Sequence, residues 1–76
     1  YNGMDILIHT DFIKLDQLLK LSGVAPTGGA AKEMIVAGLV AVDGERCIQR
    51  GRKIYPGMRV TVEGERTADI LVGKEG

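Results

Sequence analysis

The sequence predicts an α+β fold in which a two-helix hairpin packs on a small antiparallel β-sheet. Between Leu15 and Gly38 apolar residues recur every three or four positions, and after Gly38 they recur every second position. Glycine and proline stand where each spacing ends. A chain of 76 residues is of the size of one domain, so we expect residues 1–76 to form a single domain.

A first strand is expected at residues 4–8, and residues 9–14 are expected to be a connection. A first helix then begins at Leu15, because Leu15, Leu18 and Leu19 fall on one helical face. Gly23 is expected to close this helix as a left-handed cap.

A second helix is predicted to start after Thr27, a residue type that caps helix N-termini well. Pro26 prevents the first helix from continuing into the second. Gly38 ends the second helix. Its buried stripe is predicted to consist of Ala31, Met34 and Ile35.

The remaining residues predict short strands separated by turns. Val40 and Val42 alternate in a strand that Asp43-Gly44, a strong hairpin signal, brings to an end. Further strands are expected at residues 47–48, 58–63 and 70–72, with turns at residues 56–57 and 64–65.

Charge is distributed unevenly although the formal net charge is zero. Residues 1–45 hold three basic and six acidic groups, whereas residues 46–76 hold seven basic and four acidic groups. A neutral total therefore conceals a basic segment that a polyanion could meet. The cations of residues 46–59, where no acid occurs, are Arg46, Arg50, Arg52, Lys53 and Arg59.

The start of the second helix is a candidate anion site. Gly28 and Gly29 lack side chains, so a phosphate could approach the free amides at the positive end of the helix dipole. Lys32 follows one turn later and adds a mobile charge. The alternatives are that the glycines permit a tight turn or close helix packing, and that the lysine is merely solvated.

A second candidate site is the basic loop, which we define as residues 49–53. Arg50, Arg52 and Lys53 surround the adaptable Gly51, and arginine donors match phosphate geometry. Arg46 is a further candidate, whereas Arg59 is expected to be structural surface. The alternative is a solvated loop that serves solubility.

Little in the sequence indicates catalysis. One cysteine, Cys47, and one histidine, His9, cannot form a disulfide or a thiolate zinc site, and we expect no metal, cofactor or small-molecule substrate. No apolar run has the length of a membrane span, and the single cysteine fits a reducing compartment, so a cytoplasmic protein is expected. Because the sequence shows no paired carboxylates, metal-ligand cluster or nucleotide-binding loop, we expect that it is not an enzyme. With one Phe, two Tyr and no Trp, recognition is expected to rely on backbone and shape.

A spread-out pattern in residues 14–63 resembles the S4 RNA-binding domain. It combines Leu15-Asp16-x-x-Leu19 and Gly23, the stretch from Thr27 to Asp43-Gly44, and Tyr55-Pro56-Gly57 followed by Val60 and Val62. Two departures are Thr27-Gly28 in place of the common Ser-Arg and Asp43 in place of asparagine. The glycine pair and the basic loop resemble the small, stand-alone bacterial branch of the family.

The resemblance implies a module that binds structured RNA, such as ribosomal or transfer RNA, through its helix pair and basic loop. We expect the protein to be a monomer. The resemblance also implies an RNA contact for Lys14, where the family often has arginine. The full set of expected contacts is Lys14, Thr27, Gly28, Gly29, Lys32, Arg46, Arg50, Arg52 and Lys53. An alternative is an adaptor that docks an acidic, ribosome-associated protein.

Overall fold

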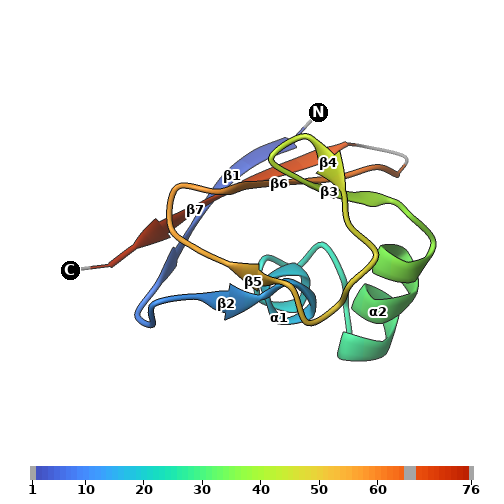
Figure 1. The fold of residues 1–76 in the computed structure, drawn as a ribbon, viewed down its shortest axis with the longest axis horizontal. Helices are drawn as coiled ribbons and strands as arrows, with labels where there is room; N and C mark the ends of the chain where they lie inside the picture. The colour runs from blue at the N-terminus through green and yellow to red at the C-terminus, as the bar shows by residue number, and fades with distance from the viewer. Residues whose placement is uncertain (1, 65–66, 76) are drawn as a thin grey trace.

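The protein is an α+β fold built around one five-stranded sheet. The structure, a computed structural model, describes residues 2–64 and 67–75. The sheet runs in the order β1-β7-β6-β3-β4 (Figure 1). Its strands are β1 (Asn2–Ile8), β3 (Val40–Val42), β4 (Glu45–Arg46), β6 (Arg59–Val62) and β7 (Ala68–Lys74).

Two helices and a separate strand pair form the other half of the fold. The helices are α1 (Leu15–Leu21) and α2 (Gly28–Val36), and the pair consists of β2 (Ile13–Lys14) and β5 (Lys53–Ile54). We call this antiparallel pair the β2–β5 ribbon. In the view of Figure 1 the helices and the ribbon lie beneath the sheet.

The core lies between the helix pair and the inner face of the sheet. The predicted helical stripe is buried at Leu15, Leu18 and Leu19, and Ala31 and Ile35 of α2 are buried with it. Full burial of each large aliphatic side chain contributes about 1.5–3 kcal/mol before entropy is counted. The sheet supplies the opposing side chains, among them Val40, Val42, Val60, Val62, Ile70 and Val72.

The predicted helix ends and the hairpin turn are confirmed. Gly23 and Gly38 follow the two helices with φ of 82° and 80°. Asp43 and Gly44 both have positive φ, 51° and 86°, which is the geometry of a type I′ turn. This turn places Glu45 directly opposite Val42.

The expected fold class is confirmed, and one strand pair of the described sheet differs from an antiparallel arrangement. β1 runs parallel to β7, whereas β7–β6, β6–β3 and β3–β4 are antiparallel. The parallel pairing joins the first and last strands of the chain. The spacing of apolar residues within a short segment carries no signal for a contact between such distant strands.

Two local expectations were wrong. The return strand after the turn is Glu45–Arg46 rather than residues 47–48, because a two-residue turn starts pairing at once. Residues 9–14 are not only a connection, since Ile13–Lys14 forms β2. The turn expected at residues 64–65 lies partly outside the described residues. Among those described, no helix has the length and apolar character that crossing a bilayer requires.

Candidate functional site

The first turn of α2 is capped and open. The Thr27 Oγ1 accepts a hydrogen bond from the Ala30 amide at 3.0 Å, as expected of an N-cap. A Cβ added at Gly28 would meet nothing within 4 Å, and one at Gly29 would lie 3.8 Å from Thr27 Oγ1. Neither glycine has a positive φ. Within the described residues, neither close packing nor a left-handed backbone therefore requires glycine at these positions.

Lys32 shares an exposed depression with this first turn. The depression is lined by Gly29, Lys32, Glu33, Val36 and Ala37, all on α2 or immediately after it. Gly29 and Lys32 are three residues apart, so they lie on the same helical face. The structure therefore places the lysine on the same side of α2 as the bare backbone.

The basic loop is attached to the start of α1 through its main chain. The Leu15 amide donates to the Arg52 carbonyl oxygen at 2.9 Å, and the Asp16 amide donates to the Arg50 carbonyl oxygen at 3.2 Å. Lys14 at the N-cap position makes no side-chain hydrogen bond to the helix amides, so these two carbonyls take the place of a side-chain cap. The side chains of Arg50 and Arg52 are exposed and free for other contacts.

The β2–β5 ribbon adds two lysines to this region. Lys14 and Lys53 are direct partners across the ribbon, and both are exposed. Hydrogen bonding and strand pairing thus gather four expected contacts, those at positions 14, 50, 52 and 53. In Figure 1 this loop and the start of α2 both lie at the lower edge, away from β4.

Arg46 is separated from this region. It lies on β4, and its Cδ would be 3.3 Å from a Cβ at Gly38. Gly38 follows the C-terminal end of α2, whereas Gly28 begins the helix. Nine helical residues span about 13 Å. The structure therefore does not bring Arg46 to the start of α2.

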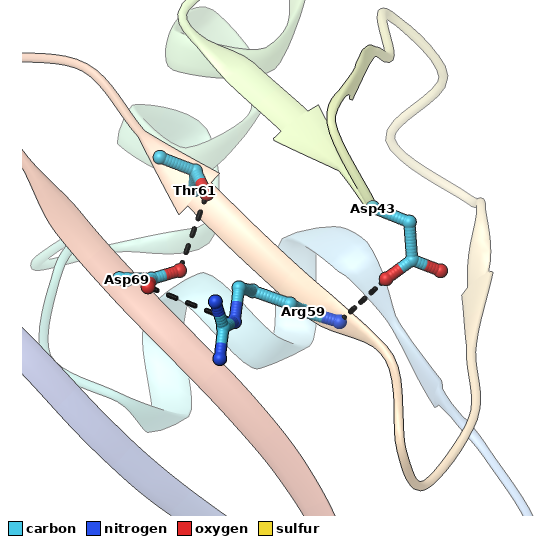
Figure 2. A network of polar contacts seen from close by, with 4 residues as sticks. All are labelled: Asp43, Arg59, Thr61 and Asp69. Atoms are coloured by element: carbon cyan, nitrogen blue, oxygen red, sulfur yellow. Dashed lines mark hydrogen bonds and ion pairs between the residues drawn. The ribbon is translucent and has the colours of Figure 1, made fainter.

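Two cations outside the expected contacts form ion pairs, whereas Lys20, which is also outside them, forms none within the described residues. Arg59 lies 3.7 Å from Asp69, which also accepts a hydrogen bond from Thr61 (Figure 2). Lys74 lies 3.3 Å from Asp11. Within residues 2–64 and 67–75, the structure gives no ion pair to the expected contacts Lys14, Lys32, Arg46, Arg50, Arg52 and Lys53.

An aromatic contact beside the basic loop was missed by the sequence analysis. The rings of Phe12 and Tyr55 have centroids 5.8 Å apart with planes at 48°. The Lys53 Nζ lies 4.9 Å from the Phe12 ring centroid. No local pattern in the sequence reveals it, because the contact depends on the pairing of β2 with β5.

Chemical groups suited to catalysis are sparse. His9 is exposed and lies 3.3 Å from Glu75, and the Cys47 thiol is buried. In the part of the chain that is described, no group of three or more His, Cys, Asp or Glu side chains could hold a metal ion. The arrangement offers positive charge and hydrogen-bond donors.

These features belong to an established class of domain. The family model described as "S4 domain" matches residues 6–70, so the chain belongs to the S4 domain family. A relative in Bacillus subtilis (strain 168), "Probable ribosome maturation protein RlbA", is 44% identical over 59 residues. The aligned segment covers 78% of this chain and 83% of the relative.

The fold is also found in a solved structure. Heat Shock Protein 15 of Vibrio cholerae, described as trimeric, superposes with a TM-score of 0.74 at 23% identity. The superposition covers 86% of this chain and 66% of that one, just under two thirds of its length. At this identity the likeness establishes the fold.

Proposed function

We propose that this chain is an RNA-binding module that holds the phosphate backbone of structured RNA with the start of α2 and the basic loop. The observation that carries the proposal is the gathering of four exposed cations at positions 14, 50, 52 and 53 beside the start of α1. Within the described residues none of these four cations has an acidic partner, so all four are available to a polyanion. Exposed, unpaired cations are the groups that exchange small counterions for phosphates.

The start of α2 would hold one phosphate. Thr27 satisfies the Ala30 amide, and the Thr27 carbonyl accepts from the Ala31 amide. The amides of Gly28 and Gly29 point out of the helix start, with no partner among the described residues. Half a positive charge from the helix dipole, together with Lys32, favours an anion here.

The basic loop would hold further phosphates. Its backbone is already fixed by the hydrogen bonds from Leu15 and Asp16, so binding has to order only the side chains of Arg50 and Arg52. Lys14 and Lys53 extend the positive surface along the ribbon. Arg46, at the other end of α2, would reach RNA only if the RNA lay along the helix.

The name of the Bacillus subtilis relative favours ribosomal RNA as the partner, with transfer RNA as the other candidate. We also propose that residues 1–76 form one domain with its motif core at 14–63, acting as a monomer in the cytoplasm without catalytic activity. The family match over residues 6–70 supports the single domain. The mass in solution, measured by analytical ultracentrifugation, tests the monomer.

The test is the affinity for structured RNA measured over a series of salt concentrations. Neutralising about four to six phosphates predicts that log K falls against log salt with a slope of about −3 to −5. An affinity that does not depend on salt would exclude this mode of binding. Displacement by bulk tRNA or rRNA is expected of the RNA-binding module, whereas an adaptor for an acidic protein would keep its partner.

A further inference from the structure

The β2–β5 ribbon has two chemically different faces. Side chains alternate along each strand, so Ile13 and Ile54 share one face. Ile54 is fully buried and Ile13 is half-buried, which identifies this face as the inner one. The residues on either side of them belong to the outer face. They are Phe12, Lys14, Lys53 and Tyr55.

The outer face holds its aromatic rings in a fixed arrangement. Phe12 and Tyr55 continue the ribbon register and contact each other across it, with centroids 5.8 Å apart. The ammonium group of Lys53 lies over the Phe12 ring, 4.9 Å from its centroid. Phe12 is half-buried beneath these contacts, whereas Tyr55 remains 46% exposed. Tyr55 is therefore the ring that a ligand can reach.

The charge around the rings is positive. Lys14 and Lys53 flank them, and the basic loop ends at Lys53. Two acids lie close by in the sequence: Asp11 is paired with Lys74 at 3.3 Å, and Asp16 accepts a hydrogen bond from the Gln17 amide at 2.8 Å. An exposed ring beside unpaired cations suits a group that is both flat and anionic. A nucleotide of RNA combines a stacking base with a phosphate on either side.

We propose that the outer face of the ribbon binds one unpaired nucleotide of RNA, whose base stacks on Tyr55 while Lys14 and Lys53 hold the adjoining phosphates. This inference rests on the proposed function and specifies the RNA further. A fully paired stem keeps its bases inside the helix, so the target would carry a bulged or looped-out nucleotide beside the stem. A single ring pair can stack one base, so we do not expect this face to bind a longer single-stranded segment.

The experiment compares two RNA hairpins that differ by a single bulged nucleotide, which carries a fluorescent aminopurine base. The wild-type protein is expected to bind the bulged hairpin about tenfold more tightly and to quench the aminopurine fluorescence by stacking. Tyr55→Leu is expected to lose this preference and the quenching while binding the fully paired hairpin as before. Tyr55→Phe, which keeps the ring and its contact with Phe12, is the matched control and retains both.

The outcomes separate the two proposals. If the wild-type protein binds both hairpins equally and with strong salt dependence, the nucleotide site is wrong and the proposed function stands. If it binds neither hairpin, both proposals fail. A preference retained by Tyr55→Leu, or an equal loss on both hairpins, also overturns the site. The quenching still tests the site if the leucine variant does not fold. Quenching by both the wild-type and Tyr55→Phe proteins supports stacking of the base, and its absence overturns the nucleotide site.

Discussion

The main-chain carbonyl of Arg52 accepts a hydrogen bond from the Leu15 amide, and this bond joins the basic loop to the first turn of α1. The helix amides are satisfied by the loop backbone rather than by a side chain. In the proposed mode of binding, the carbonyls of Arg50 and Arg52 support the fold while their side chains hold RNA. The loop can change its side chains without losing its position.

Replacing both loop arginines should separate binding from folding. In the double variant Arg50→Glu, Arg52→Glu the carbonyls remain, so α1 keeps its cap and the thermal midpoint should stay close to that of the wild type. Two charge-assisted contacts become repulsive, so RNA affinity should fall by more than about a hundredfold. Circular dichroism and RNA titration measure the two properties. Unchanged affinity in the folded variant would remove the loop from the site.

A matched pair of neutral substitutions controls for net charge. Arg52→Gln and Arg59→Gln each remove one positive charge, but Arg59 already pairs with Asp69 on the sheet (Figure 2). We expect Arg52→Gln to lower affinity and to reduce the salt slope by about one unit. Arg59→Gln should leave both close to the wild-type values. Equal effects of the two variants would mean that only total charge matters.

Alanine at the start of α2 should act on stability and on binding in opposite directions. Gly28→Ala and Gly29→Ala meet no close atom and need no left-handed backbone, so each should stabilise the fold by about 0.5–1 kcal/mol. The added methyl group stands where a phosphate would approach, so RNA affinity should fall. Chemical denaturation and RNA titration test the two effects. A more stable protein with full affinity would argue against the anion site.

The Thr27 cap can be tested by itself. Thr27→Ala removes the acceptor of the Ala30 amide and should destabilise the protein by about 1 kcal/mol. Thr27→Ser keeps the hydroxyl and should stay close to the wild type. Equal thermal midpoints for the alanine and serine variants would mean that the 3.0 Å hydrogen bond contributes nothing to stability.

The Asp43 carboxylate extends the pairing of β3 with β6. Its Oδ1 accepts from the Arg59 amide at 2.9 Å, while the Asp43 amide donates to the Arg59 carbonyl at 2.8 Å (Figure 2). Asp43→Ala loses the first bond and places a less suited residue at φ 51°, so about 2 kcal/mol of stability should be lost.

Asparagine is the matched control at this position. Asp43→Asn keeps an oxygen acceptor and tolerates positive φ, so its stability should equal or exceed that of the wild type. Denaturant titration compares the two variants with the parent protein. A loss as large in the asparagine variant as in the alanine variant would show that the carboxylate charge, rather than the hydrogen bond, is needed.

The sequence predicted the features whose signals are local. The stripe of Leu15, Leu18 and Leu19, the Thr27 cap and the Asp43-Gly44 turn each depend on neighbours within a few residues, and the structure confirms them. Strand spacing also identified Val60 and Val62 as core residues. These features define the helix pair and the hairpin, and they were enough to predict the fold class.

Features that depend on distant pairing were not predictable in the same way. β2 and β5 have two residues each and lie about forty residues apart, so neither shows a periodic pattern of its own. The capping of α1 by the carbonyls of Arg50 and Arg52 leaves no trace in residue type, because every residue has a carbonyl. Composition alone suggested too few aromatic residues for a stacking site, and only the ribbon register brings Phe12 and Tyr55 together.

The parallel contact of β1 with β7 has a consequence for how the molecule opens. More than sixty residues separate partners such as Met4 and Ile70, so this pairing closes a long loop and carries a large entropic cost. β1 is also an edge strand, held on one side only. Amide protons of β1 should therefore exchange with solvent through local detachment of that strand, sooner than those of β6 at the centre of the sheet.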